Sequence, residues 1–141
     1  MENSARNEAV FQPIEPAEEV RLFLEQNPKA NWVESLNFLL DHFPQMKESV
    51  VQWLIEGGTA IRLLFPNKPE PNDIDIVTID SELKHKLANS RKFDAKTPEE
   101  WLQSREINPS PDNVELLMNN PQSVRVGDRE VLILNRTILA T

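Results

Sequence analysis

Two pairs of residues in one short stretch have the types and the spacing to do chemistry together. Residues 54–80 read LIEGGTAIRLLFPNKPEPNDIDIVTID and hold two of the three glycines of the chain, Gly57 and Gly58. The same stretch carries Asp73 and Asp75, an acid-x-acid pair inside an apolar run. Each pair needs a reason, because the chain is poor in glycine and an apolar strand rarely carries two carboxylates.

The spacing of the aspartates places both carboxylates on one side of a strand. Side chains alternate across a strand, so Asp73 and Asp75 face one way while Ile74 and Ile76 face the other. Two neighbouring carboxylates repel each other, and a bound cation would remove that cost. A set of oxygen ligands suits Mg²⁺ or Mn²⁺, which would also hold substrate phosphates. The alternative is a solvated acidic face on an edge strand.

The two glycines lie between the apolar end of an expected strand and the start of an expected helix. A residue without Cβ lets the backbone turn sharply and lets a ligand come close. The helix that follows, with Thr59 at its start, would point unpaired N–H groups and its positive dipole end at this turn. Such a place suits a phosphate. The alternative is a tight turn that binds no ligand.

The two features complement each other, because one could hold a triphosphate and the other the metal ion that activates it. Residues 66–72, PNKPEPN, contain three prolines and are therefore expected to lack regular structure. This loop lets the chain leave the helix and return to a neighbouring strand. Both groups could then reach one site.

The order apolar-Gly-Gly, helix, loop and Asp-Ile-Asp-Ile resembles the nucleotidyltransferase superfamily of the DNA polymerase β type. EGGTAIRLLF followed by NDIDIVT is most similar to the bacterial branch that contains abortive-infection toxins. The resemblance covers residues 53–78 and extends more weakly to VRVGDREVLILNRTILAT at residues 124–141. It implies that a nucleoside monophosphate passes from a nucleoside triphosphate such as ATP to an acceptor hydroxyl, with release of pyrophosphate.

The resemblance also implies roles for single residues. Asp73 and Asp75 would bind Mg²⁺ or Mn²⁺ and act as catalytic residues. Gly57, Gly58 and Thr59 would hold the β- and γ-phosphates of the nucleotide.

In that superfamily a third acid on a later strand joins the metal-binding pair. Glu115 is the best match, because it stands between apolar residues in NVELLM, on an expected strand. It would complete the metal ligands and could accept the proton of the acceptor. Asp112 and Asp128 compete for the role, but both fall in expected loops or turns. The alternative for Glu115 is an exposed position on an edge strand.

Two departures from the superfamily leave a second function open. Relatives carry a basic residue and a small hydroxyl residue just ahead of the first aspartate, where this chain has Pro69 and Pro71. Lys68 is the nearest base and is our candidate for nucleotide binding. Relatives in the toxin branch also continue past the last helix with a lysine and an acid, whereas this sequence ends at Thr141. The second function is therefore a non-catalytic nucleotidyltransferase-like module that binds a nucleotide or a partner, as in a toxin–antitoxin system.

A third function, an interaction domain with no nucleotide role, would make the glycines a turn and the aspartates an exposed edge. The acceptor hydroxyl of the leading hypothesis is left open between a small molecule, a protein and an RNA end.

The elements that must position these residues form a mixed α/β (α+β) domain, with one mixed β-sheet flanked by helices. Helices are predicted at residues 15–27, at 31–43 with Asn31 as cap, at 59–65, at 81–89 with Ser81 as cap, and from Pro98 with Thr97 and Glu100 as a capping box. Residues 47–52 are expected to start helical and to lead into a strand at 53–55. Further strands are predicted at 73–79 and 114–118, with a hairpin at 123–134 that turns at Gly127 and Asp128. A last helix is predicted after Asn135.

Length and charge set further limits. The chain has 141 residues, which predicts one domain at 16–141 behind a flexible tail at 1–15. A formal charge of −8 disfavours broad binding to nucleic acid. The chain has no cysteine, which excludes disulfides and thiolate metal sites. No apolar run reaches the roughly 18 residues of a membrane span, and the N-terminus lacks an apolar signal, so we expect a cytoplasmic protein without a membrane partner.

The apolar residues near the C-terminus predict a partner. Ile138 and Leu139 need a surface to bury against, on their own domain, on a second copy or on another chain. We therefore expect an exposed apolar patch near this end and on the first two helices. Such a patch favours a homo-oligomer or a partner protein that supplies missing catalytic groups.

Overall fold

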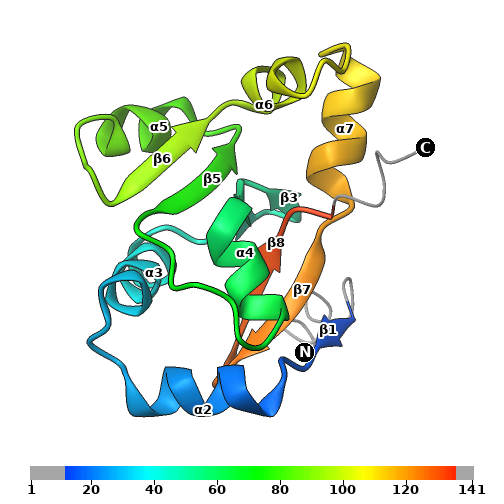
Figure 1. Ribbon diagram of the computed structural model, residues 1–141. Coiled ribbons are helices and arrows are strands. Elements are labelled where there is room, and N and C mark those ends of the chain that lie inside the picture. Colours follow the sequence, from blue (N-terminus) through cyan, green and yellow to red (C-terminus); the bar gives the residue numbers. More distant parts are fainter. Residues whose placement is uncertain (1–11, 136–141) are drawn as a thin grey trace.

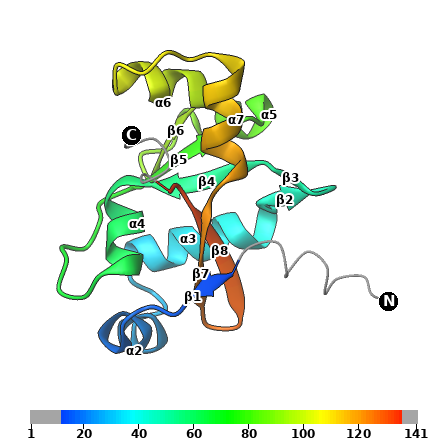
Figure 2. The same ribbon diagram turned by 90° about the vertical axis from the view of Figure 1, so that its right-hand side faces the viewer.

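A six-stranded mixed sheet with helices on both faces forms the fold, as the computed structural model shows for residues 12–135 (Figures 1 and 2). The strand order is β1-β7-β8-β4-β5-β6. This arrangement confirms the predicted α+β class with one sheet between helices.

The helices of the described residues are α2 (Glu18–Gln26), α3 (Asn31–His42), α4 (Gly57–Leu64), α5 (Ser81–Leu87), α6 (Pro98–Ser104) and α7 (Pro111–Asn119). The sheet contains β1 (Pro13–Ile14), β4 (Trp53–Glu56), β5 (Ile74–Thr78), β6 (Phe93–Lys96), β7 (Gln122–Val126) and β8 (Arg129–Ile133). A separate hairpin pairs β2 (Met46–Lys47) with β3 (Val50–Val51). None of the helices in residues 12–135 is long and apolar enough to cross a membrane.

The register of the three strands β4, β5 and β6 decides which side chains meet. β5 runs antiparallel to β4, and Glu56 pairs with Asp75. β6 runs parallel to β5 on its other side, and Asp75 pairs with Asp94. Three acidic residues from three neighbouring strands therefore stand in one row across the sheet.

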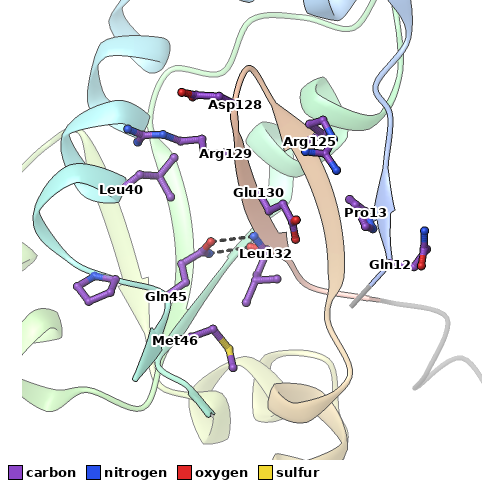
Figure 3. Close-up of a pocket in the computed structure, with 11 residues that line it drawn as sticks. Gln12, Pro13, Leu40, Gln45, Met46, Arg125, Asp128, Arg129, Glu130 and Leu132 are labelled. Carbon is purple, nitrogen blue, oxygen red and sulfur yellow. Dashed lines mark hydrogen bonds between the residues drawn. The ribbon is translucent and has the colours of Figure 1, made fainter. Parts of the chain in front are cut away.

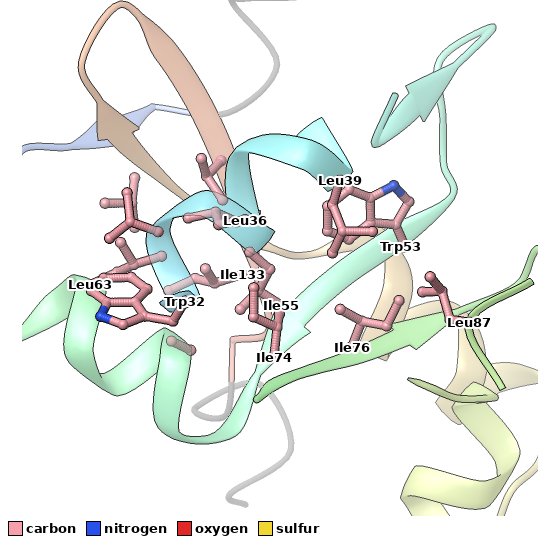
Figure 4. Packing of buried hydrophobic residues seen from close by; sticks show 14 of the residues in the cluster. Trp32, Leu36, Leu39, Trp53, Ile55, Leu63, Ile74, Ile76, Leu87 and Ile133 are labelled. Carbon is pink, nitrogen blue, oxygen red and sulfur yellow. The ribbon is translucent and has the colours of Figure 1, made fainter. Parts of the chain in front are cut away.

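Two apolar clusters cover the two faces of the sheet, because neighbouring residues of a strand alternate between them. Ile55 and Ile76 belong to the cluster that packs under α3, α4 and α5 (Figure 4). Leu54 and Val77 belong to the cluster under α6 and α7. Since Asp75 and Val77 share a face, Asp75 points to the α6–α7 side of the sheet.

The start of α6 confirms the predicted capping box. The Thr97 hydroxyl accepts a hydrogen bond from the Glu100 N–H at 3.1 Å, and the Glu100 carboxylate accepts one from the Thr97 N–H at 2.9 Å. Pro98 occupies the first turn, where its missing N–H is not needed.

The caps predicted for two other helices are wrong. Asp80, not Ser81, caps α5, because its carboxylate accepts hydrogen bonds from the N–H groups of Glu82 and Leu83 at 3.0 and 3.2 Å. Asn31 is the first residue of α3 instead of its cap, and that cap position has no side-chain hydrogen bond.

The predicted helical start at residues 47–52 is also wrong. The stretch folds as the β2–β3 hairpin, in which Met46 pairs with Val51. Glu48 and Ser49 form its turn with positive φ values of 53° and 67°. The two turn residues match a tight hairpin turn, and the β-branched Val50 and Val51 suit a strand.

The strand predicted at residues 114–118 is a helix, α7. Ser110 caps it by accepting from the Asn113 N–H at 3.2 Å, and Pro111 occupies its first turn. A short apolar run does not distinguish a strand from a buried helix segment, whereas a serine cap followed by proline is typical of a helix start. Glu115 therefore stands on a helix and not on a strand of the sheet.

The predicted β7–β8 hairpin is confirmed, with Gly127 and Asp128 between its strands. β6 was not predicted. β1 lies within residues 1–15, the predicted N-terminal tail, and pairs with β7 in parallel. The helix predicted after Asn135, with Ile138 and Leu139, lies outside the described residues.

Gln45 joins β4 to β8 where their own pairing is short. The two strands pair at Ile55 and Ile133. The buried Gln45 amide donates to the Leu132 carbonyl oxygen at 2.9 Å and accepts from the Leu132 N–H at 2.8 Å (Figure 3). It also donates to the Trp53 carbonyl oxygen at 3.2 Å. The Gln45 side chain thus connects the backbones of β4 and β8, as a backbone hydrogen bond between the strands would.

Gln45→Ala is expected to lower the free energy of unfolding by about 1–3 kcal/mol, because it leaves buried backbone groups unpaired. Gln52→Ala is the matched control, since the Gln52 amide donates to the Val50 carbonyl at the surface. Urea denaturation measures both variants. Equal losses of unfolding free energy in the two variants would contradict the role of Gln45 as a connection between β4 and β8.

Candidate functional site

Gly57 brings the end of β4 and the start of α4 against the Asp75 carboxylate. Its φ is +69°, a conformation that residues with side chains rarely adopt. A Cβ at this position would lie 2.4 Å from Asp75 Oδ2, closer than atoms can approach. Glycine is therefore required here for two reasons, the backbone turn and the room taken by the carboxylate.

Gly58 is exposed and has more room. A Cβ there would lie 3.8 Å from the Cβ of Pro71, an ordinary contact. The protein itself therefore does not require glycine at this position. The predicted close approach of a ligand to Gly58 stays a prediction.

The Thr59 side chain ties α4 to the residue that precedes β5. It is fully buried, and its hydroxyl donates to the Asp73 carbonyl oxygen at 3.2 Å. The Thr59 hydroxyl is thus already bonded within the protein, and the predicted contact of Thr59 with a phosphate stays a prediction.

Negative charge is concentrated around Asp75. Burial is the main cause that raises the pKa of Asp75 to about 6, and the carboxylates of Glu56, Asp73 and Asp94 raise it further. Lys96 partly opposes them. A cation bound here would relieve this repulsion, as expected for the predicted pair Asp73 and Asp75.

Glu56 is held firmly by α6 and its neighbours. Its side chain is buried, and the Trp101 indole N–H donates to Glu56 Oε1 at 3.4 Å. Lys96 Nζ and Arg105 Nη2 each lie 3.9 Å from its carboxylate oxygens. Glu56 therefore has partners within the protein.

Lys96 is a cation built into the acidic row. Its ammonium lies 3.2 Å from Asp94 Oδ2. Burial works against the charged form, but the hydrogen bond to Asp94 and the charges of Asp94, Glu56 and Asp75 outweigh it and raise the pKa of Lys96. The lysine neutralises part of the charge that a metal ion would neutralise.

The structure does not bring the three candidates for the third acid to this site. Glu115 is exposed on α7 and lines a cavity of about 370 Å³ with Val50 and Ile79. It is not among the charged groups that shift the pKa of Asp75. Asp112 is exposed in the first turn of α7, and Asp128 is exposed in the β7–β8 turn.

Lys68 is exposed on the loop at residues 66–72, between α4 and β5. A cavity of about 790 Å³ lies elsewhere, between β1, the end of α3 and the β7–β8 hairpin (Figure 3). Of the predicted residues, this cavity includes only Asp128, so it is separate from the row around Asp75.

Sequence reasoning missed Asp94 and Glu56, the two acids that pair with Asp75 across the sheet. A signal for Asp94 was present, because Phe93 and Ala95 alternate with Asp94 and Lys96 in the period of a strand. Only the pairing of three strands shows that Asp94 stands next to Asp75.

The residues present fit a magnesium or manganese ion that is shared with a substrate. Within residues 12–135, no three His, Cys, Asp or Glu side chains are arranged to hold a metal ion by themselves. Mg²⁺ commonly takes one or two carboxylates together with substrate phosphates and water, and does not need a complete protein cage. Asp73 and Asp75, whose charges act on each other, are the carboxylates that could take part in such a shared site.

A scan against protein-family models gives no match, and no curated protein and no solved structure is significantly similar to the chain. The resemblance to nucleotidyltransferases therefore rests on the motif residues themselves.

Three glycine substitutions separate backbone strain from the crowding by Asp75. Gly127 has a φ of +65°, and a Cβ added there would meet no atom within 4 Å. Gly127→Ala should therefore lower the free energy of unfolding by about 1–2 kcal/mol through backbone strain alone. Gly57→Ala should lose clearly more, because its Cβ also displaces the Asp75 carboxylate. Gly58→Ala should lose least. Chemical denaturation measures all three, and equal losses at Gly57 and Gly127 would show that Asp75 moves aside freely.

Asp75 should make stability fall as pH rises through its titration. Its folded pKa, about 6, lies above its ordinary value of 3.8, so the folded chain binds this proton more tightly. The contribution is fully present below the ordinary value and is lost as the pH passes about 6. Unfolding midpoints of the wild type and Asp75→Asn, measured across this range, should converge at low pH, with the variant becoming relatively more stable at neutral pH. A constant difference would contradict the shifted pKa.

Proposed function

We propose that the chain binds a nucleoside triphosphate at the β4–α4 turn and transfers its nucleoside monophosphate to an acceptor hydroxyl, releasing pyrophosphate. The observation that carries this proposal is the contact of Gly57 with Asp75. It joins a turn suited to phosphates to a crowded carboxylate suited to a metal ion. The motif resemblance of residues 53–78 supports the same reaction.

The first turn of α4 would hold the phosphates. Its N–H groups have no partner within the helix, and the dipole of the helix favours negative charge at this end. Gly57 and Gly58 contribute no side chain that would keep a phosphate away. The exposed Lys68 on the following loop would add a positive charge.

Asp73 and Asp75 would hold the metal ion together with the substrate phosphates, and Asp94, not Glu115, is the further acid next to this pair. When bound, Mg²⁺ or Mn²⁺ would neutralise phosphate charge and activate the acceptor oxygen. Burial is the main cause of the raised pKa of Asp75, and the repulsion from Glu56, Asp73 and Asp94 that raises it further favours such a cation. A nucleoside triphosphate as substrate agrees with the predicted cytoplasmic location of the protein.

A second function is favoured by Lys96. Because this ammonium lies 3.2 Å from Asp94 Oδ2 and 3.9 Å from Glu56 Oε2, the acidic row is partly neutralised without a metal. The chain would then be a non-catalytic module that binds a nucleotide or a partner, as in a toxin–antitoxin pair.

An apolar cavity next to the turn supports a partner or a second copy in either function. It has a volume of about 530 Å³, and its lining runs from Gly57 along α4. Ile14, Ile61 and Phe65 line it and are 39%, 37% and 50% exposed. The predicted exposed patch on the first two helices has a counterpart in Leu22 and Phe38, which are also exposed.

Thermal unfolding with Mn²⁺ and each nucleoside triphosphate tests binding. Ligand at about 100 times its Kd should stabilise the wild type by about 2.7 kcal/mol. The double variant Asp73→Asn, Asp75→Asn should lose this stabilisation, and Asp94→Asn should weaken it. Glu115→Gln is the control and should respond like the wild type. The proposal is wrong if the double variant keeps the full response.

Transfer is tested separately by incubating the chain with Mg²⁺, each triphosphate labelled at the α-phosphate, and cell extract. Labelled product that depends on Asp75 supports the enzyme. Binding without labelled product supports the non-catalytic module.

A further inference from the structure

Arg62, in the last turn of α4, is a buried cation that pairs with two carboxylates, Glu19 and Glu70. Its side chain is 2% exposed. Nη1 and Nη2 donate to the two carboxylate oxygens of Glu19 at 3.1 and 2.9 Å, and Nε donates to Glu70 Oε2 at 2.8 Å. The paired bonds to Glu19 fix the direction of the guanidinium as well as its distance.

The two carboxylates belong to segments that are far apart in the sequence. Glu19 lies on α2, which packs next to α4 (Figure 1), and Glu70 lies on the loop at residues 66–72. Glu19 also accepts from the Asn67 N–H at 3.2 Å. Glu70 also accepts from the Trp32 indole N–H of α3. One guanidinium therefore joins α2, α3, α4 and the loop.

The charges of this cluster depend on one another. Burial alone would lower the pKa of Arg62, but its hydrogen bonds to Glu19 and Glu70 outweigh burial and raise it. The Phe23 ring covers the guanidinium, with its centroid 4.8 Å from Cζ. A buried charge that loses one partner strongly destabilises its surroundings. The ion pair with the buried Arg62 thus holds the Glu70 carboxylate, and with it the loop, in place.

The loop that Arg62 holds leads directly into the proposed nucleotide site. Pro71, one residue after Glu70, is the nearest neighbour of the space above Gly58. Asp73 follows and receives the Thr59 hydroxyl bond on its carbonyl oxygen. Any movement of the loop would therefore shift both a wall of the phosphate turn and a proposed metal ligand.

We propose that Arg62 is a positioning residue, which latches residues 66–72 onto α4 through Glu70 and couples this latch to α2 through Glu19. The inference rests on the proposed function and deepens it. It makes α2 part of the machinery of the nucleotide site, although α2 carries none of the residues proposed to bind the nucleotide. Loosening the latch should weaken triphosphate binding from a distance.

Two variants loosen the latch while keeping the size of the side chain, Glu19→Gln and Glu70→Gln. The matched control is Glu25→Gln, on the same helix, because Glu25 forms an exposed ion pair with Arg21 at 3.0 Å. Arg62→Lys completes the series, since lysine keeps the charge but cannot form the paired bonds.

Amide hydrogen exchange is measured without nucleotide at the loop residues that carry an N–H, which are residues 67, 68, 70, 72 and 73. The Kd for ATP with Mn²⁺ is measured by calorimetry. Both are recorded well below the melting temperature of each variant. Glu19→Gln and Glu70→Gln should speed exchange of the loop and raise the Kd about tenfold. Glu25→Gln should match the wild type in both measurements.

Unchanged loop exchange in both latch variants would overturn the latch, whether or not nucleotide binds. Faster exchange with an unchanged Kd would overturn the positioning role, because a merely structural contact gives that pattern. If the wild type binds no triphosphate, the proposed function fails, and the exchange rates alone decide the latch. If Glu19→Gln does not fold, Glu70→Gln and Arg62→Lys give the same comparison.

Discussion

The crowding of the Asp75 carboxylate is the constraint on which the rest of the site depends. The strand register places Asp75 between Glu56 and Asp94, and the β4–α4 turn leaves room for its oxygen only because residue 57 is glycine. A half-buried carboxylate among other carboxylates is unfavourable, and the raised pKa of Asp75 records that cost. The fold keeps this arrangement because apolar residues on both sides of Asp75 hold the strand in register.

Two further charged clusters lie on the elements next to this arrangement. On the α6 side, the Trp101 indole, Lys96 and Arg105 surround Glu56 and partly neutralise the row. On the α4 side, Arg62 forms ion pairs with Glu19 of α2 and Glu70 of the loop, two carboxylates that do not act on Asp75. Acidic residues outnumber basic ones, 23 against 15, so a cation placed next to two carboxylates relieves repulsion that the sequence otherwise leaves unbalanced.

Local patterns in the sequence predicted the parts of the site that depend on nearby residues. The glycine turn, the strand with Asp75 and the capping box at Thr97 follow from short-range rules of backbone geometry. The strand predicted at residues 114–118 was wrong because a short apolar run fits a strand and a buried helix equally well. Asp94 and the Arg62 cluster were missed for a different reason. Their partners are far away in the sequence and come close only when the strands pair and the helices pack.

The choice between the enzyme and the non-catalytic module comes down to what neutralises the acidic row. With Lys96 next to Asp94 and Glu56, the row already has one cation, and a metal ion must compete with it for the same oxygens. A triphosphate at the first turn of α4 would change this balance, because its charge would attract both the metal ion and the lysine. Nucleotide and metal should therefore bind together in an enzyme. In the module, Lys96 would remain with the carboxylates, and the nucleotide would bind without metal.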